Sequence, residues 1–476
     1  MRPSQSLGTI ALLVVLPSAA SAQSAAASQA AVTTSVDQRV DAFIRSEMAR
    51  QKVPGIGLAV IRRGEVLRLS GYGEANVEHK VPVTPETIFQ SGSLGKMFTS
   101  ALILLLVEDG KIALDRSIAA YLPNVPESFT AITVRHLLTH TSGIPDYTEE
   151  LIDFQKNYTE DELTAAAFKL KLEFPPGSRW NYSNTGYVLL GIIAGRVGGK
   201  FYGDQLRERV FGPAGMTTAR VISEEDIIPN RAAGYRLARG ELKNQNWVAP
   251  RLNTTADGSL YFSLRDLVAW ERAVRTRAVL APESWARVVE PVRLTSGRPY
   301  PYGMGWSLDT VGGQPTQGHG GAWQGFKTQL TRYMGDDMTV IVLANAAQAN
   351  PGLFVDSIAA IYSPTLVRPT PGPIADTNPA IAERLKSLLA DAAAGKLDPA
   401  QFAYVRAGYF PNAPRAFQNM LKDRGAPTRV TLITRRQIGD DIVSTYVVSY
   451  GSTDFEAGLA LAPDGKVAQF GVRPRR

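Results

Sequence analysis

Apolar residues near the N-terminus recur first at helical and then at strand spacing. Residues 35–51 carry them close to every third or fourth position, which predicts a helix that Pro54 ends. Residues 56–61 and 66–69 are two short apolar runs, and the Arg-Gly pair at 63–64 between them has the composition of a tight turn. We therefore expect a helix followed by a β-hairpin.

The middle of the chain carries longer apolar runs that are typical of buried helices. The run from Met97 to Val107 predicts one such helix, and 186–197 predicts a second. A short helix is expected at 132–139. Ser263 has the position of a helix cap ahead of the apolar segment 267–274. This region is therefore expected to be mainly helical.

Strand-like runs return at 326–333 and 338–343, on either side of a polar turn. The order of strands, helical middle and strands predicts one antiparallel sheet, built from N- and C-terminal strands and interrupted by a large helical insertion. This is an α+β architecture, because a doubly wound fold alternates strands and helices along the chain.

A proline-rich segment, residues 363–377, predicts a stiff linker before the C-terminal residues 378–476. Beyond the linker we expect a separate small α+β domain without a catalytic cluster. Its predicted elements are two helices (381–394 and 413–423) and four strands (429–436, 441–450, 453–461 and 466–472). The pattern loosely resembles a cystatin- or NTF2-like module. Substrate gating, dimer contact and cell-wall binding all stay open as its role, and the oligomeric state is not predicted.

The first residues have the pattern of a targeting signal. Arg2 precedes an apolar run at 9–16, and small residues end at Ala22, which predicts a signal peptide over residues 1–22. The apolar run is too short to span a bilayer comfortably. We therefore expect a mature chain without a transmembrane segment, in the bacterial periplasm or secreted.

Composition narrows the chemistry that an exported chain can use. The sequence has no cysteine, which excludes disulfide bonds, cysteine nucleophiles and thiolate metal sites. The formal net charge is +7, and residues 366–476 hold 15 Lys and Arg against 10 Asp and Glu. This C-terminal excess is interpreted as a solvated basic surface, with attraction to an anionic envelope as the alternative. We expect no nucleic-acid partner.

Ser93 and Lys96 are the most informative chemical pair in the sequence. They stand three residues apart at the start of the apolar run, so their side chains share one helical face. A serine becomes a good nucleophile when an adjacent base takes its proton. A lysine among apolar groups can lose its charge and act as that base. The pair alone is a weak signal, because Ser-x-x-Lys also arises by chance.

Two further segments supply possible partners for this pair: Tyr182-Ser183-Asn184 and His319-Gly320-Gly321. With Ser93 and Lys96 they follow the order and spacing of the penicillin-recognising serine hydrolases, which the chain resembles over residues 35–362. That group includes class C β-lactamases, D-Ala-D-Ala carboxypeptidases, D-aminopeptidases and related esterases. Further landmarks of the resemblance are residues 136–143, 302–306 and 340–345.

The resemblance implies a role for each matching residue. Ser93 attacks an acyl carbonyl and forms an acyl-enzyme, while Lys96 and Tyr182 share the base role, with the choice between them open. Asn184 orients Lys96 and the substrate amide. The remaining substrate-binding positions are His319, Gly321 and Ala322, and the backbone N–H groups of Ser93 and Ala322 form the oxyanion hole.

The chain departs from many relatives at positions 319 and 320. His319 stands where β-lactamases and carboxypeptidases often carry lysine, and Gly320 where they carry a hydroxyl residue. A fixed cation with a hydroxyl suits a substrate carboxylate, whereas histidine is only partly charged near neutral pH. We therefore favour a hydrolase of small ester, amide or peptide substrates. A peptidoglycan peptidase acting on cell-wall peptide, a β-lactamase, and a non-catalytic binding protein are the alternatives.

Other motifs in the sequence are weaker indications of function. His136 and His140 have the spacing of a helical metal site, but the glutamate of the zinc-protease pattern is missing, so we interpret them as structural and expect neither metal nor cofactor. Residues 195–200 fall short of a phosphate loop and are interpreted as a helix C-terminus. No G-x-S-x-G elbow is present, which argues against an α/β-hydrolase.

Overall fold

The structure is a computed structural model that describes residues 35–148, 152–368 and 372–475. The predicted signal peptide, residues 1–22, lies outside the described residues. None of the helices in these ranges is both long and apolar enough to cross a bilayer.

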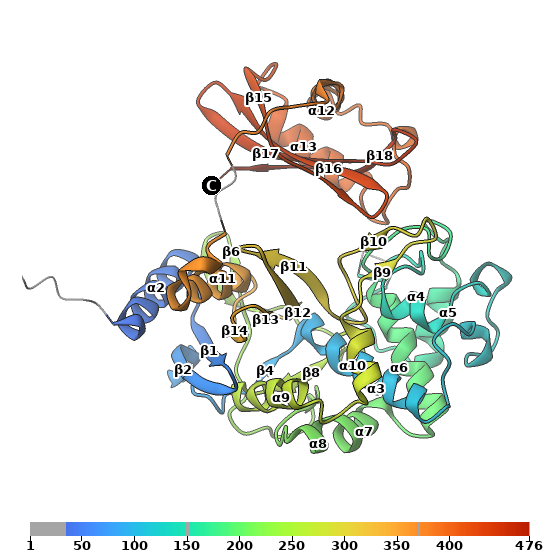
Figure 1. The fold of residues 1–476 in the computed structure, drawn as a ribbon, viewed down its shortest axis with the longest axis vertical. Coiled ribbons are helices and arrows are strands. Elements are labelled where there is room, and N and C mark those ends of the chain that lie inside the picture. The colour runs from blue at the N-terminus through green and yellow to red at the C-terminus, as the bar shows by residue number, and fades with distance from the viewer. Residues whose placement is uncertain (1–34, 149–151, 369–371, 476) are drawn as a thin grey trace, which may run out of the picture.

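The central element is a seven-stranded sheet in the order β11-β12-β13-β14-β1-β2-β3 (Figure 1). All neighbouring strands in it are antiparallel. Strands β1 and β14 pair along their length, with Ile56 opposite Ala344, so the two ends of the sequence region meet in mid-sheet. The strands are β1 (Gly55–Arg62), β2 (Glu65–Asn76), β3 (Val81–Pro82), β11 (Ser307–Val311), β12 (Gln314–Trp323), β13 (Phe326–Tyr333) and β14 (Met338–Ala344). The predicted α+β architecture is confirmed.

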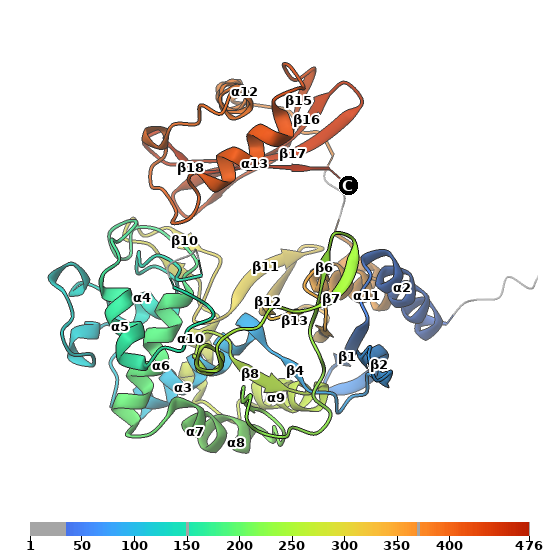
Figure 2. The same cartoon turned by 180° about the vertical axis from the view of Figure 1, so that it is seen from behind.

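One face of this sheet is covered by α2 (Val36–Gln51) and α11 (Pro351–Tyr362). Val40 and Ile44 of α2 and Phe354 of α11 form one buried cluster with residues of β1 and β14. In α2 the apolar positions recur at helical spacing, and Ser35 caps its first turn through a capping box. The first expected helix is therefore confirmed, and the last helix before the linker closes the same layer (Figures 1 and 2).

The helical insertion covers the other face. Its helices are α3 (Lys96–Glu108), α4 (Val134–Leu138), α5 (Glu160–Phe168), α6 (Asn184–Gly198), α7 (Tyr202–Leu206), α8 (Gly212–Ala214), α9 (Leu264–Thr276) and α10 (Pro282–Val288). Helix α3 is buried from Lys96 to Leu106, as its apolar run predicts. Helix α6 ends at Gly199 in the left-handed conformation, which confirms the interpretation of 195–200 as a helix C-terminus.

Short strands connect the insertion to the sheet. Three small sheets contain β4 (Phe89–Gln90), β5 (Arg220–Val221) and β8 (Leu260–Phe262); β6 (Tyr235–Ala238) and β7 (Glu241–Asn244); and β9 (Val292–Arg293) and β10 (Pro299–Tyr300). Strand β8 leads directly into α9. Sequence patterns did not indicate these strands, because two to four residues are too few to establish an alternation.

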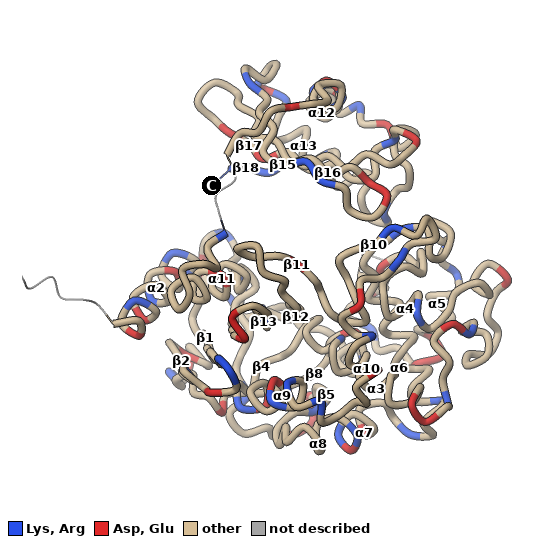
Figure 3. Tube along the Cα trace, viewed as in Figure 1, with Lys and Arg blue, Asp and Glu red and all other residues tan. Residues whose placement is uncertain are grey.

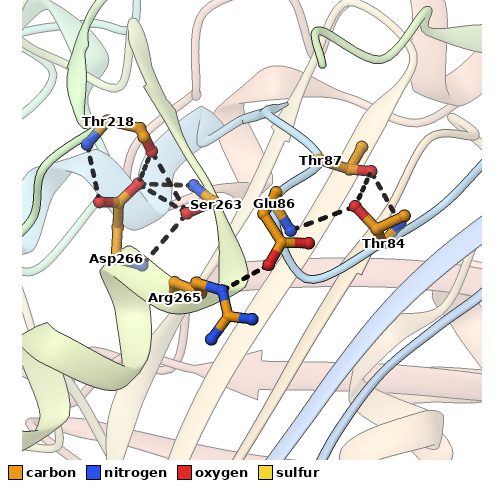
Figure 4. A network of polar contacts seen from close by, with 7 residues as sticks. All are labelled: Thr84, Glu86, Thr87, Thr218, Ser263, Arg265 and Asp266. Atoms are coloured by element: carbon orange, nitrogen blue, oxygen red, sulfur yellow. Dashed lines mark hydrogen bonds and ion pairs between the residues drawn. The ribbon is translucent and has the colours of Figure 1, made fainter. Parts of the chain in front are cut away.

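The start of α9 shows how the sequence fixes one of these junctions (Figure 4). The Ser263 hydroxyl accepts a hydrogen bond from the Asp266 backbone N–H, and the Asp266 carboxylate accepts one from the Ser263 backbone N–H at 2.8 Å. Asp266 also accepts from the backbone N–H of Thr218 at 3.0 Å. The predicted cap is confirmed, and it ties α9 to the loop before β5.

Residues 379–474 form a four-stranded antiparallel sheet with two helices against it. The helices are α12 (Pro379–Ala393) and α13 (Asn412–Leu421), and the strands are β15 (Arg429–Ile438), β16 (Asp441–Tyr450), β17 (Thr453–Leu461) and β18 (Val467–Pro474). Their apolar side chains make a buried cluster of their own. All six elements lie where the sequence predicts them. The domain division at 378 and the cystatin- or NTF2-like likeness stay predictions.

A buried ion pair joins the helical insertion to the sheet. Arg332 on β13 contacts Glu271 on α9 at 3.0 Å, and only 14% and 5% of their side-chain surfaces are exposed. Arg332 also donates to Gln317 on β12 at 3.1 Å. Burial raises the pKa of Glu271, which Arg332 partly counteracts. Removing one partner of such a pair leaves the other charge buried without compensation.

We expect Glu271→Ala to lower the free energy of unfolding by about 3–5 kcal/mol, because Arg332 then loses its counter-charge. Arg275→Ala in the exposed Arg275–Asp337 pair is the matched control, and its effect should stay below about 1 kcal/mol. Urea unfolding followed by tryptophan fluorescence measures both. Equal effects of the two variants would show that the buried pair adds nothing to the junction.

Candidate active site

Ser93 lies in a one-turn 3-10 segment, η1 (Gly92–Gly95), that runs directly into α3. Gly92 has φ +51°, and a Cβ added there would lie 2.3 Å from the Ala322 nitrogen. A Cβ at Gly321 would lie 2.0 Å from the Ser91 carbonyl oxygen. The serine turn and strand β12 therefore approach each other backbone to backbone, and both positions require glycine.

Lys96 follows one turn later and has no exposed surface. Its Nζ donates to the Ser93 hydroxyl at 3.0 Å and to Asn184 Oδ1 at 2.6 Å, and it also donates to the Asp257 backbone carbonyl. Burial lowers the pKa of Lys96 to about 8, although Asp257 and Asp146 raise it in part. A neutral amine at this place lies within hydrogen-bond reach of the Ser93 proton.

Tyr182 lies over the same amine. The Lys96 Nζ is 4.9 Å from the centre of the Tyr182 ring, and 5.2 Å from that of Tyr187. The Tyr182 hydroxyl is buried and has no hydrogen-bond partner of good geometry among the residues the structure describes. Burial raises the pKa of Tyr182 well above its usual value, and Ser93 is the neighbour that opposes this shift. A phenolate is therefore disfavoured here.

Asn184 connects Lys96 to a carboxylate one step away. Its Oδ1 accepts from Lys96, while its Nδ2 donates to Asp146 Oδ2 at 3.0 Å. Asn184 begins α6, and Ser183 caps that helix by accepting from the Gly186 N–H. The predicted Ser93, Lys96, Tyr182 and Asn184 thus come together around one buried amine.

His319 lies beside Tyr182, with ring centroids 6.3 Å apart, and a chain of hydrogen bonds connects it to Ser183. The Ser183 N–H donates to His140 Nδ1 at 3.1 Å, and His140 Nε2 bonds the Tyr302 hydroxyl at 3.2 Å. That hydroxyl bonds His319 Nε2 at 2.9 Å, and His319 Nδ1 bonds the Gly320 carbonyl at 2.6 Å.

The two backbone groups at the ends of this chain fix its direction. An N–H only donates and a carbonyl only accepts, so His140 carries its proton on Nε2 and His319 on Nδ1. Tyr302 then accepts from His140 and donates to His319. Both imidazoles are neutral in this arrangement. Burial, together with the nearby Lys96 charge, lowers the pKa of His319 to about 4. His140 is shifted downward for the same reasons.

Gly321 and Ala322, predicted as substrate-binding positions, lie on β12 beside the serine turn. The sequence missed the part of Asp146, Asp257 and Tyr302 in the site. Tyr302 belonged to a landmark segment of the family resemblance, whereas no motif surrounds the two aspartates. His136 accepts from the Thr133 N–H in the cap of α4, in accord with a structural role. Within the described ranges no cluster of His, Asp or Glu could hold a metal ion.

With Lys96 as the base, the rate at which a fluorophosphonate labels Ser93 should rise with pH through about 8, because only a neutral amine can accept the serine proton. Asp257→Asn should move this rise to lower pH, since the Asp257 charge favours protonated Lys96. Asp115→Asn, at an exposed ion pair with Arg135, is the control and should leave the profile in place. A labelling rate that falls through pH 8 would show that protonated Lys96 is the active form and would contradict its role as the base.

His319 should stay neutral from pH 7 down to about pH 5, with its proton on Nδ1, because its pKa lies near 4. Nitrogen-15 NMR of the imidazoles measures both properties, and His319→Asn assigns the signal. Tyr302→Phe removes the donor to Nε2 and should shift that nitrogen signal selectively. A His319 that becomes charged between pH 7 and 6 would contradict the hydrogen-bond order.

Comparisons with known proteins identify the family of this chain. The family model described as Beta-lactamase matches residues 40–361. The chain is 32% identical over 302 residues to penicillin-binding protein 4* of Bacillus subtilis (strain 168), a match that covers 59% of this chain and 66% of the relative. It is 30% identical over 347 residues to a D-aminopeptidase of Gluconobacter oxydans (strain 621H), covering 70% of this chain and 64% of the relative. The chain thus covers less than two thirds of either relative.

Solved structures show the same likeness. An octameric penicillin-binding protein homologue from Pyrococcus abyssi matches with a TM-score of 0.61 and 25% identity, over 92% of this chain and 96% of that one. A D-amino acid amidase from Ochrobactrum anthropi SV3, complexed with L-phenylalanine amide, matches with a TM-score of 0.61 and 26% identity, over 69% of this chain and 99% of that one. The chain belongs to the Beta-lactamase family, the group of serine hydrolases that its sequence motifs resemble.

Proposed function

We propose that this protein is a serine hydrolase that cleaves amide or peptide bonds through an acyl-enzyme on Ser93. The observation that carries the proposal is the buried Lys96 amine, 3.0 Å from the Ser93 hydroxyl and with a pKa lowered to about 8. A buried amine held in this way has no evident structural purpose, whereas it is what activation of a serine requires.

In the proposed reaction, Ser93 Oγ bonds to the substrate carbonyl carbon as Lys96 takes the hydroxyl proton. The C–N bond then breaks, and the proton passes to the leaving nitrogen through Lys96 and the neutral Tyr182 hydroxyl. Water later hydrolyses the ester on Ser93 by the reverse route. The backbone N–H groups of Ser93 and Ala322 are proposed as the oxyanion hole, in line with the close approach of β12 to the serine turn.

The charges around the site favour a substrate with a free amino group over one with a carboxylate. His319 is neutral and both of its ring nitrogens are engaged within the protein. It therefore offers no fixed cation to a carboxylate. Asp146 and Asp257 instead place two carboxylates around Lys96. This supports an aminopeptidase or amidase rather than a carboxypeptidase or β-lactamase.

The relatives support the same substrate class. Similar proteins include a D-aminopeptidase and a D-amino acid amidase, and we extend from them the proposal that the acyl part is a D-amino acid. Cell-wall peptide, esters and β-lactams remain weaker candidates, and a non-catalytic role would leave the assembled Ser93–Lys96–Asn184 group without a use. A periplasmic or secreted location is proposed from the signal-peptide pattern of residues 1–22.

Hydrolysis of D-phenylalanine amide should exceed that of its N-acetyl derivative and of the L-amide by roughly tenfold or more, a difference of about 1.4 kcal/mol that one charge contact can supply. Ser93→Ala should lower kcat/KM by at least roughly 10⁴-fold, because the nucleophile is lost. Ammonia release measures all of these rates.

Ser100→Ala is the matched control, since Ser100 is buried on α3, the helix that follows the serine turn, and its hydroxyl has no hydrogen-bond partner among the described residues. It should keep activity within about threefold of the parent protein. Faster turnover of a cephalosporin or of D-Ala-D-Ala than of the D-amide would refute the substrate class and leave the Ser93 mechanism intact. An unaffected Ser93→Ala variant would refute the mechanism itself.

A further inference from the structure

A cavity of about 380 Å³ lies beside Tyr182, and two distant parts of the sequence line it. Trp180, Tyr182 and Tyr300 contribute one wall from the region of the helical insertion. Tyr404 and Phe470, from the C-terminal residues, contribute the opposite wall. The cavity therefore exists only because the C-terminal four-stranded sheet packs against the region that carries Tyr182.

Specific contacts hold the two walls together. Arg179 pairs with Asp441 at 3.0 Å, and the Ala407 N–H donates to Glu173 at 2.8 Å. The rings of Phe174 and Tyr404 meet edge to face at 5.6 Å. The Arg179 guanidinium also lies 5.3 Å from the centre of the Tyr404 ring.

A second ion pair lies at the tip of the β15–β16 hairpin, where Asp440 meets Arg298 at 3.5 Å. A Cβ added to the neighbouring Gly439 would lie 2.9 Å from Leu294, so the hairpin packs closely on this segment. Acidic and basic segments of the two parts face each other beside β10 (Figure 3). The two parts therefore share an interface made of ion pairs, aromatic ring contacts and a backbone-to-carboxylate hydrogen bond.

The lining of the cavity combines seven aromatic residues with the polar or charged side chains of Asn181, Arg406, Asp441 and Gln469. The Trp180 and Tyr300 rings are stacked, with centroids 4.5 Å apart and an angle of 12° between them. Tyr409 adds a further ring on the opposite side. The Trp180 indole N–H is buried and has no partner among the described residues. Such a lining suits a flat, apolar group with a hydrogen-bond acceptor at its edge.

We propose that the C-terminal residues complete a subsite for the leaving group of the substrate, and that this subsite takes an aromatic or large apolar amine. The inference rests on the proposed function, in which Tyr182 lies on the path that returns a proton to the leaving nitrogen. The departing amine is therefore released beside Tyr182, the residue of the proposed proton path that also lines the cavity. The C-terminal sheet then acts as a specificity wall, and an aromatic ring attached to that nitrogen is stabilised by burial against Tyr404.

Substrates with one acyl part and two leaving groups test the subsite. For D-phenylalanine anilide and D-phenylalanine methylamide, Tyr404→Ala should lower the ratio of the two kcat/KM values by roughly tenfold, because only the anilide loses a ring contact. Tyr121→Ala is the matched control: Tyr121 has the same half-buried class of exposure and does not line the cavity. It should leave the ratio within about twofold.

A second variant keeps the test valid if Tyr404→Ala loosens the interface. Gln469 is exposed and lines the cavity, so Gln469→Trp fills the space without removing a ring, and it should lower the same ratio. Ratios unchanged in both variants, or equal losses for both amides, would overturn the subsite.

Binding to an inactive variant separates this inference from the proposed function. p-Nitroaniline should give saturation-transfer NMR signals with Ser93→Ala, and adding Tyr404→Ala should abolish most of that signal. If the parent protein cleaves neither amide but this binding pattern holds, the proposed function fails and the aromatic cavity stands. If the parent protein cleaves the amides but Tyr404→Ala leaves the p-nitroaniline signal unchanged, the proposed function stands and only the subsite is refuted.

Discussion

A lysine amine buried among uncharged acceptors is the condition on which the rest of the site depends. The three hydrogen-bond acceptors of Lys96 are a hydroxyl, an amide oxygen and a backbone carbonyl. A carboxylate in direct contact would hold the amine protonated. Asn184 keeps the Asp146 carboxylate out of direct contact with Lys96, because the amide lies between the two groups. The Asp146 charge therefore stabilises the protonated amine less than a direct ion pair would. Neutral imidazoles on the far side add no competing charge.

The geometry that brings this amine to Ser93 is set by the sheet. Pairing of β1 with β14 places the two ends of the region in mid-sheet, and β12 then lies two strands from β14 with the serine turn against it. Only glycine at 92 and 321 permits that approach. The proposed nucleophile, base and oxyanion donors are therefore positioned mainly by backbone packing, which is stiffer than any set of surface loops.

Local patterns were sufficient to predict most long elements and the residues nearest the nucleophile. The buried run of α3, the Ser263 cap and the strands β13 and β14 have signals within a few residues, and so do Ser93 and Lys96. Asp257 has none, because its contact with Lys96 spans more than a hundred residues of sequence, and the landmark segment around Tyr302 did not indicate its bond to the distant His140. The neutral state of His319 likewise could not be predicted from the sequence. A histidine titrates near neutrality in water, and only its burial beside Tyr302 removes that property.

The hydrogen-bond chain from Ser183 to Gly320 has a mechanical consequence. It begins at the cap of α6 in the helical insertion and ends on β12 in the sheet, so it acts as a strut between these two parts of the fold. Each link points the same way, and an extra proton on either imidazole would set two donors against each other. Strong acid would therefore release the strut and free the two halves to separate. At neutral pH the intact chain holds the start of α6 and strand β12 at a fixed separation.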